Sequence, residues 1–179
     1  IYESDAQYGF SAAGKGRRVI LEYVSANPTG PLTIAHGRQA CVGDAMARIL
    51  KMAGYEPHRE YYMNDAGRQM NLLGRSLHAR YSELVGETDY PLPEEGYQGD
   101  YLIALAQEIL NEKGKTLVGK RDPQTEDYFF RFAKDKIFLD IQKDLHESGV
   151  NFDEVFSERS LFESGEVECS GLFGDYRWQ

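Results

Sequence analysis

Residues 17–54, "RRVILEYVSANPTGPLTIAHGRQACVGDAMARILKMAG", carry the clearest structural pattern in this chain of 179 residues. The run at 17–25 is β-branched and aromatic and stops at turn-forming residues, which predicts a strand buried on both faces, as in a parallel sheet. From Gly37 apolar residues recur every three to four positions, and this spacing predicts a helix that ends at Gly54. A strand followed by a helix in this way is the start of a βαβ unit.

The same alternation continues along the chain. Residues 56–64 predict a second strand, and residues 65–85, with apolar side chains at helical spacing, predict a second helix. Strand, helix, strand and helix joined by short links are typical of an α/β protein with a doubly wound parallel sheet. We therefore predict an α/β fold whose sheet begins within residues 18–85.

An acidic stretch with two prolines interrupts this rhythm after residue 85. Two further helical patterns follow, at about 100–113 and 124–148, so residues 86–148 predict a mainly helical insertion in the α/β unit. The segment "VNFDEVFSE" at 150–158 then predicts a return of the chain to the sheet.

The two ends of the chain have weaker patterns. Residues 1–17 are polar and glycine-rich and predict a linker or the tail of an upstream N-terminal domain. The segment 149–179 leads back toward the α/β fold, but its last part, 166–179, matches no expected element. The first residue is Ile rather than Met, which suggests an excised fragment of a longer protein.

Composition and charge limit the class of protein. With 41% hydrophobic and 27% charged residues the chain can form a core, and its apolar runs are far shorter than the ~20 residues of a membrane span. The net charge of −9 argues against a nonspecific nucleic-acid binder, although local patches such as 14–18 can still contact nucleic acid. No signal peptide opens the chain, and two cysteines, Cys41 and Cys169, predict unpaired thiols in a reducing cytoplasm.

Glu22 and His36 are unusual within this pattern. A carboxylate in a buried strand is costly unless it is paired, so Glu22 either faces water at a sheet edge or pairs with a cationic ligand such as a guanidinium. His36 lies at the predicted helix start, where unpaired N–H groups and the helix dipole suit phosphate. A histidine that only caps the helix is the alternative, and position alone leaves both alternatives open.

The loop between them combines polar Ser25, Asn27 and Thr29 with the fixed backbone of Pro28 and Pro31. Neither a P-loop nor a dinucleotide-binding glycine motif is present. The four histidines have no ligand spacing with one another or with the cysteines, which argues against a structural zinc site, so we predict no metal site.

Taken together, these residues resemble the catalytic domain of arginyl-tRNA synthetases, a family of class I aminoacyl-tRNA synthetases. The resemblance rests on residues 21–50, 61–76, 97–101 and 149–165, and so covers most of the chain from about residue 18 to 165. It implies the first half of a Rossmann-like (HUP-type) doubly wound parallel sheet with a mainly helical insertion. The KMSKS-type loop, the second half of the nucleotide-binding fold and the anticodon-binding domain of that family have no counterpart in the sequence.

The resemblance also implies catalytic residues. Residues 33–36 occupy the place of the HIGH-type signature, whose histidines contact ATP phosphates and stabilise the adenylation transition state. His36 matches the final histidine, Thr33 stands where the first histidine is usual, and Ala35 replaces the usual glycine. A threonine hydroxyl can still donate one hydrogen bond, so a working variant of the signature is expected.

The binding residues follow from the same resemblance. Glu22 matches the carboxylate that pairs with substrate arginine, and Ser25 and Asn27 match positions that line the arginine and ATP pocket. The implied ATP-binding signature loop comprises Ala26, Asn27, Pro28, Thr29, Gly30, Pro31, Leu32, Thr33, Ile34, Ala35, His36 and Gly37.

The activity implied is ATP-dependent ligation of arginine to its tRNA through arginyl-adenylate, with ATP as substrate and Mg²⁺ accompanying it. The chain is expected to be inactive alone, and the full-length protein to be a cytoplasmic monomer without a membrane partner. Two alternatives stay open. One is a small-molecule nucleotidyltransferase with a T-x-G-H-like signature, which explains Thr33 and His36 but not Glu22. The other is a non-catalytic tRNA- or nucleotide-binding module derived from a synthetase.

Overall fold

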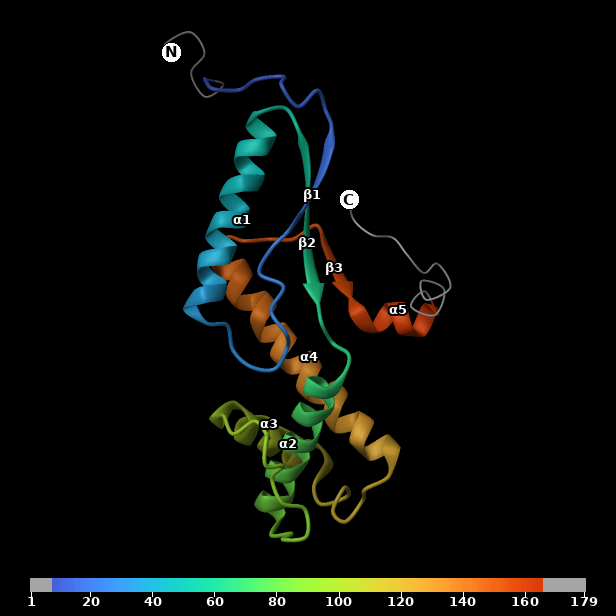
Figure 1. Ribbon diagram of the computed structural model, residues 1–179. Helices are drawn as coiled ribbons and strands as arrows, with labels where there is room; N and C mark the ends of the chain where they lie inside the picture. The colour runs from blue at the N-terminus through green and yellow to red at the C-terminus, as the bar shows by residue number, and fades with distance from the viewer. Residues whose placement is uncertain (1–7, 166–179) are drawn as a thin grey trace. The chain divides into compact units, whose positions relative to one another are not determined.

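The computed structural model describes residues 8–165, which contain one parallel sheet of three strands in the order β1-β2-β3. The strands are β1 (Arg18–Glu22), β2 (Glu56–Met63) and β3 (Glu154–Ser157). The helix α1 (Ile34–Met52) forms the crossover between β1 and β2, as parallel strands require (Figure 1). The predicted α/β fold with a parallel sheet is confirmed.

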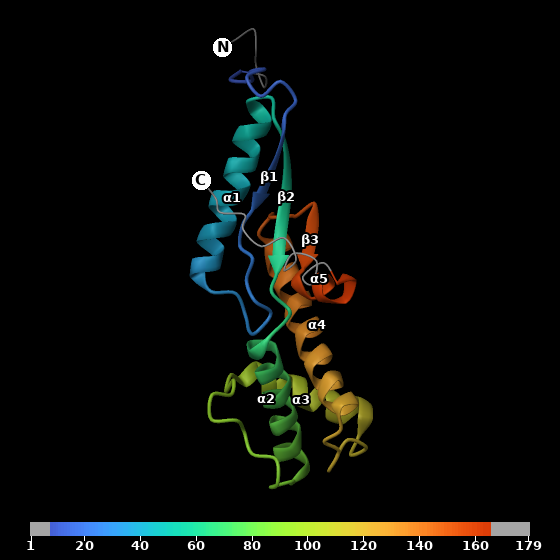
Figure 2. The ribbon, with the colours of Figure 1, turned by 45° about the vertical axis from the view of Figure 1, so that its right-hand side comes forward.

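The described residues divide into two compact units. Residues 8–26, 32–64 and 144–165 belong to the first unit, which holds the sheet, α1 and α5 (Glu158–Ser164) (Figure 2). Residues 27–31 and 65–143 belong to the second unit, which holds α2 (Arg68–Val85), α3 (Asp100–Lys113) and most of α4 (Pro123–Glu147).

The helix α1 begins at Ile34, earlier than the start predicted at Gly37. Thr33 is its N-cap residue with an extended backbone, and the Thr33 N–H donates to Nδ1 of His36 at 3.0 Å. This local bond closes the first turn before the apolar repeat begins, and the repeat therefore predicts the start too late. At the other end the helix stops at Met52 and Gly54 takes a left-handed φ of 83°, so the predicted glycine stop is confirmed.

The strand β1 ends at Glu22, before the predicted end at Ser25. Val24 and Ser25 have φ values of 67° and 41°, in the left-handed region that a β-branched residue rarely adopts. The chain therefore leaves the sheet one residue after Glu22, and it does so through a strained turn rather than a glycine.

The predicted burial of β1 on both faces is wrong for the described residues. Exposure alternates along the strand, with Arg18, Ile20 and Glu22 exposed and Val19 and Leu21 partly covered. The helix α1 packs on one side only, which leaves the side chain of Ile20 67% exposed on the other.

Part of the segment predicted as a linker at 1–17 packs on the C-terminal end of α1. The backbone N–H groups of Ser11, Gly14 and Gly16 donate to the carbonyls of the residues from Met52 to Gly54, at 2.8–2.9 Å. The two backbones approach so closely that a Cβ on Gly14 would lie 2.5 Å from the Gly54 carbonyl carbon. Residues 1–7 lie outside the described residues.

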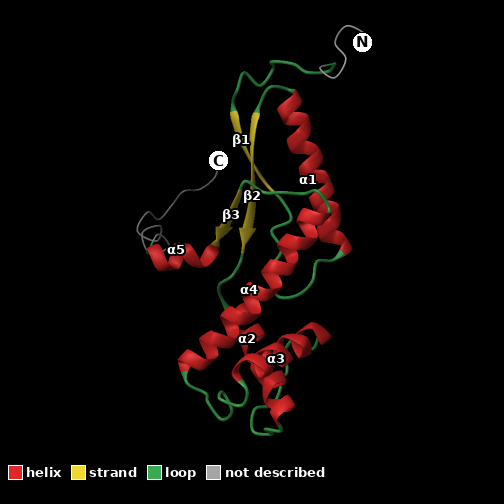
Figure 3. Cartoon of the chain, turned by 180° about the vertical axis from the view of Figure 1, so that it is seen from behind, coloured by secondary structure: helices red, strands yellow, loops and turns green. Residues whose placement is uncertain are grey.

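The second unit is helical, and its helices α3 and α4 confirm the two patterns predicted within the insertion (Figure 3). The apolar side chains of its core include Leu73, Leu77, Leu102, Ile109 and Phe129. The helix α2 packs on α3, and Gly74 of α2 lies against the backbone of Phe130 of α4. Residues 65–85, which we predicted as part of the sheet half, lie in the same compact unit as residues 86–143.

The return to the sheet is confirmed by β3, which pairs in parallel with β2, while α5 was not predicted. Cys41 is a free, exposed thiol, as predicted, whereas Cys169 and the unassigned segment 166–179 lie outside the described residues. No helix among residues 8–165 combines the length and the hydrophobicity that a bilayer crossing requires.

His78 of α2 is buried in the second unit between two aromatic rings. Its ring centroid lies 4.1 Å from that of Tyr90 and 4.2 Å from that of Phe129, and its Nδ1 has no hydrogen-bond partner among the described residues. Burial lowers the pKa of His78 below its usual value, an effect that Arg121 adds to and that Glu126 and Glu87 partly offset. The folded protein therefore holds this imidazole neutral where the unfolded chain would protonate it.

We expect this burial to make stability fall in mild acid. Above the unfolded pKa of about 6.5 neither state carries the proton. As the pH falls below that value, the unfolded chain gains a proton that the folded chain lacks. The free energy of unfolding then decreases by up to about 1.4 kcal/mol per pH unit, until the pH reaches the lowered pKa of the folded state. In urea unfolding between pH 7.5 and pH 5, His78→Phe should have a flatter pH dependence than the parent. An equal slope in both proteins would contradict this assignment.

Candidate active site

The carboxyl end of β1 places Glu22 beside the strained turn at Val24 and Ser25. The Ser25 hydroxyl donates to Oε1 of Glu22 at 2.9 Å and accepts the backbone N–H of Tyr62 at 3.1 Å. The left-handed backbone at Ser25 thus lets one side chain join the end of β1 to β2. Strain of this kind is found where surrounding structure holds a functional residue in place. The second oxygen of the exposed Glu22 carboxylate is left for a ligand.

A buried tyrosine holds the next residue of the loop. The Tyr61 hydroxyl donates to the Ala26 carbonyl at 2.6 Å, and the Tyr61 ring packs edge-on against Phe152. Burial raises the pKa of Tyr61 to about 12, so this hydroxyl stays protonated and remains a donor at neutral pH. The turn that carries Ser25 is therefore anchored on both sides.

Residues 27–31 of the loop belong to the second unit and are held there by polar contacts. The Asn27 side-chain amide donates to Oε1 of Gln69 at 2.9 Å, and the Tyr101 hydroxyl donates to the Thr29 carbonyl at 2.6 Å. Burial raises the pKa of Tyr101 to about 12, which keeps this donor protonated too. Pro28 is buried, as expected of a rigid element in the loop.

Thr33 and His36 form one small cluster at the start of α1. His36 Nδ1 accepts the Thr33 N–H at 3.0 Å and lies 3.2 Å from the Thr33 hydroxyl. A neutral imidazole that accepts at Nδ1 carries its proton on Nε2. The capping contact therefore sets the tautomer and leaves an Nε2–H donor at the positive end of a helix, which is an arrangement suited to an anionic oxygen.

Gly37 follows directly and has open space around it. A Cβ built on this residue would meet no atom within 4 Å. The first turn of α1 is thus accessible on the side of Gly37, where the missing side chain lets a ligand come close to the backbone.

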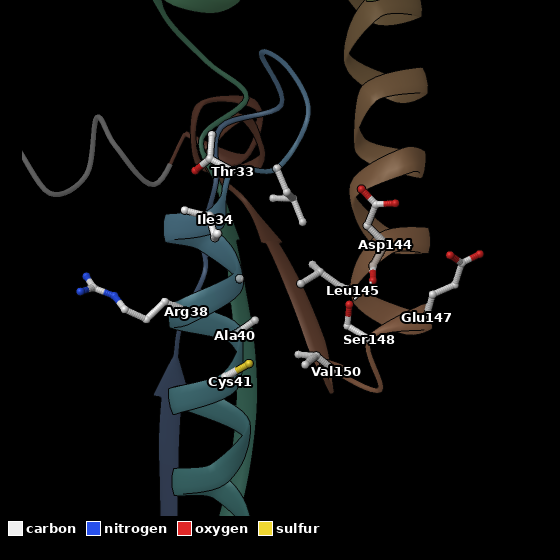
Figure 4. A pocket seen from close by; sticks show the side chains of 12 residues that line it. Thr33, Ile34, Arg38, Ala40, Cys41, Asp144, Leu145, Glu147, Ser148 and Val150 are labelled. Carbon is white, nitrogen blue, oxygen red and sulfur yellow. Dashed lines mark hydrogen bonds between the residues drawn. The ribbon is translucent and has the colours of Figure 1, made fainter.

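A cavity of about 660 Å³ lies in the first unit next to this helix start (Figure 4). The N-cap Thr33 and three residues of α1, Ile34, Ala40 and Cys41, line it on one side. Leu145 and Val150 face them from the other side, while the Arg38 side chain extends away. The volume falls within the range of small-molecule sites, and the facing walls are largely apolar. The cavity can hold the apolar part of a ligand whose charged part lies at the helix start.

The structure thus arranges the predicted site residues in three groups. Glu22 and Ser25 are bonded to each other, Thr33 and His36 are bonded to each other, and Asn27 is bonded to Gln69 in the second unit. Gln69, the partner of Asn27, is not among the predicted site residues. It lies in the first turn of α2, whose N-cap is Gly67, and Asp65 before it is buried with Lys134 Nζ 3.7 Å away.

Comparison with known proteins identifies the family of this chain. The family model described as class I tRNA synthetases (R), catalytic domain, matches residues 1–168. The chain is 50% identical over 161 residues to an arginine–tRNA ligase of Syntrophotalea carbinolica, which covers 90% of this chain and 29% of that protein. It is 46% identical over 168 residues to that of Desulfotalea psychrophila, covering 94% of this chain and 30% of the relative.

Solved structures show the same relationship. A crystal structure described as an arginyl-tRNA synthetase from Campylobacter jejuni superposes with a TM-score of 0.80 at 32% identity, over 99% of this chain and 39% of that one. The arginyl-tRNA synthetase of Thermus thermophilus shares the fold, with a TM-score of 0.54 at 22% identity over 88% of this chain and 26% of its own. The chain spans about 30% of the length of the curated relatives it matches, and it belongs to the family of class I arginyl-tRNA synthetase catalytic domains.

Proposed function

We propose that this chain forms the signature-bearing half of the active site of an arginine–tRNA ligase. In the first step, the carboxylate of arginine attacks the α-phosphate of ATP in line, and arginyl-adenylate forms as pyrophosphate leaves. In the second step, the arginyl group passes from the adenylate to the terminal adenosine of tRNA and AMP is released. The observation that carries the proposal is the pairing of Glu22 with Ser25 at the end of β1, in the same unit as the Thr33 and His36 cluster.

The role proposed for Thr33, His36 and Gly37 is to hold the triphosphate. Charge builds up on the phosphate oxygens in the transition state, and the Nε2–H of His36 can donate to one of them as pyrophosphate departs. Gly37 leaves room for the phosphates to approach the backbone of the first turn. Little covalent chemistry is asked of the protein, so positioning and charge stabilisation dominate.

The role proposed for Glu22 is to read the guanidinium of arginine. One carboxylate oxygen is occupied by the Ser25 hydroxyl, which fixes the carboxylate plane, and a guanidinium can approach it with its planar fork of donors. The ammonium of lysine cannot make this fork, so the same contact would exclude lysine. For Asn27, which Gln69 holds within the second unit, a role in binding arginine is proposed from the sequence resemblance.

The test is arginine-dependent exchange of pyrophosphate with ATP by the full-length protein in the presence of its tRNA. Replacing Glu22 with Gln keeps the shape but removes the charge, and a hydrogen bond to a charged group is worth about 1.5–3 kcal/mol. We expect KM for arginine to rise by about 10- to 150-fold, with a smaller change in kcat. Glu94→Gln, at an exposed carboxylate of the second unit, is the matched control and should leave KM unchanged.

Discrimination between arginine and lysine distinguishes recognition of the guanidinium by Glu22 from a purely structural role of this residue. The parent protein should reject lysine, and Glu22→Gln should narrow the ratio of kcat/KM between arginine and lysine. The same ratio in both proteins would contradict the assignment of Glu22 to the guanidinium. Pyrophosphate exchange that does not depend on arginine would contradict the proposed function itself.

The remaining parts of the proposal concern partners. The loop from Ala26 to Gly37 contains no carboxylate, so Mg²⁺ is expected to arrive on the phosphates of ATP rather than to be held by the loop. The insertion at 86–148 is proposed to lie near the acceptor end of the tRNA. That the full-length protein is cytoplasmic and monomeric stays a prediction. Sedimentation of the full-length protein would check the monomeric state.

A further inference from the structure

The open face of the sheet gathers acidic side chains in one row. In the parallel register Glu22 pairs with Glu60, and Glu60 pairs with Glu154, so one glutamate from each strand stands on the same face. Like charges on directly opposed residues of neighbouring strands are destabilising. Such a row is stabilised when a cation is bound among the carboxylates.

His58 adds an imidazole to this row. It precedes Glu60 by two residues on β2, so both side chains lie on one face of the strand. Its Nε2 lies 3.0 Å from Oε2 of Glu154, and one ligand atom each from His58, Glu60 and Glu154 lie within 4.8 Å of one another. The donor set is therefore one nitrogen and two carboxylate oxygens, rather than an exposed acidic cluster alone.

The strands that carry these side chains are held together from the other face. Arg59 donates from its Nε and from its terminal amino group to the two carboxylate oxygens of Asp153, at 2.9 and 2.7 Å, and its backbone N–H donates to the same carboxylate. The hydrogen bond from Arg59 is the main reason why the pKa of Asp153 falls to about 2. Because this pair fixes β2 against the chain entering β3, Glu60 stays opposite Glu154, and His58, two residues earlier on β2, stays within reach of it.

We propose that His58, Glu60 and Glu154 bind a zinc ion. Zinc takes imidazole nitrogen and carboxylate oxygen at roughly 2.0–2.2 Å, with three protein ligands leaving a fourth position for water. Two atoms bound to one zinc ion are at most about 4.2 Å apart, so small side-chain rotations close the present arrangement. The Glu154 side chain is 52% exposed and that of His58 29%, which leaves both room to rotate and the site open to solvent.

The chemistry selects zinc over the magnesium that accompanies ATP. Magnesium prefers oxygen ligands in a near-ideal octahedron and retains several waters, whereas an imidazole donor suits zinc. Among the described residues the Glu60 carboxylate has no hydrogen bond or ion pair, so it is free to bind the ion. The ion would join β2 to β3 and so fasten the segment that returns from the insertion to the sheet.

Calorimetric titration of the 179-residue chain with zinc chloride tests this site, with magnesium chloride as the comparison. We expect one zinc ion to bind per chain, at least about tenfold more tightly than magnesium. Glu60→Gln and His58→Gln should each weaken zinc binding by more than the roughly tenfold that changes to outer-shell residues cost. Glu56→Gln, on the same strand and the same face but outside the group of three, should bind zinc as the parent does.

A second readout separates coordination from a change in folding. Cobalt(II) in the same site should show visible absorption typical of a four- or five-coordinate ion. Glu60→Gln should lose this absorption, although without metal it should be at least as stable as the parent, because one of the opposed charges is removed. The proposal is overturned if Glu56→Gln loses as much zinc affinity as Glu60→Gln. Zinc would then be attracted by the overall negative charge of this face rather than coordinated by the three side chains. It is also overturned if His58→Gln and Glu60→Gln bind zinc like the parent, with the ion held elsewhere.

Discussion

His36→Asn in the full-length protein is expected to lower kcat for adenylate formation by about 10²- to 10³-fold, the usual cost of removing one donor to a developing oxyanion. His36 Nδ1 accepts the Thr33 N–H, and its Nε2–H is the group proposed to reach the phosphate. The amide oxygen of asparagine can replace Nδ1 as acceptor and keep the cap, but nothing in asparagine replaces the Nε2–H. Rapid-quench measurement of adenylate formation at saturating arginine and ATP gives the rate directly.

His36→Gln is the matched control, because its amide nitrogen can reach the position of Nε2 while the contact with Thr33 is lost. We expect this variant to be less stable than His36→Asn and yet more active. The loss of an N-cap contact costs about 1 kcal/mol in the free energy of unfolding. If His36→Asn instead keeps the parent kcat, His36 is only a capping residue, which is the alternative that the sequence left open.

Gly43→Ala is expected to destabilise the first unit by about 1–3 kcal/mol, because a well-packed contact would be overfilled. A Cβ on Gly43 would lie 2.2 Å from Cγ of the Tyr23 ring, well inside van der Waals contact. The ring has little freedom to move, since it packs against the tilted ring of Phe152 with centroids 4.7 Å apart. Urea unfolding, together with hydrogen exchange of α1 and β1, measures the loss and assigns it to this unit.

Gly37→Ala in the same helix is the control for intrinsic helix propensity. A Cβ on Gly37 meets open space, so the substitution should stabilise α1 by about 0.5–1 kcal/mol. Combining Gly43→Ala with Tyr23→Leu should recover part of the lost free energy, giving a coupling between the two positions. Additive effects, or a Gly43→Ala protein as stable as the parent, would show that α1 does not pack on Tyr23 as described.

Much of the fold could be predicted from local patterns. Strands β1 and β2, helix α1, and the helices α3 and α4 of the insertion all arise near the predicted residues, because apolar side chains repeat with the period of each element. The boundaries that were wrong have local causes. The contact of Thr33 with His36 starts α1 early, and the left-handed backbone of Val24 and Ser25 ends β1 early. Neither cause can be recognised from the spacing of apolar residues along the chain.

The candidate site was predicted in part. The residue types at Glu22, Thr33 and His36 suggested a role for each one, and the spacing between them matched the family's signature. The partners could not be predicted in the same way. Gln69 reaches Asn27 across 42 positions of the chain, and Tyr61 reaches the Ala26 carbonyl across 35, so no local pattern relates them. The assignment of α2 to the second unit likewise depends on which helix it packs against.

Element types, the parallel sheet and the family were therefore determined by the sequence alone, because each depends on the period or order of residues along the chain. The tertiary structure decided which side chains meet. The row of Glu22, Glu60 and Glu154 exists only because β2 pairs with β1 on one edge and, after the insertion, with β3 on the other. His58 has no ligand spacing with any other histidine or cysteine, yet this register brings it to a glutamate 96 residues away. Strand register is set by packing over the whole unit, and for that reason it could not be read from any single stretch of residues.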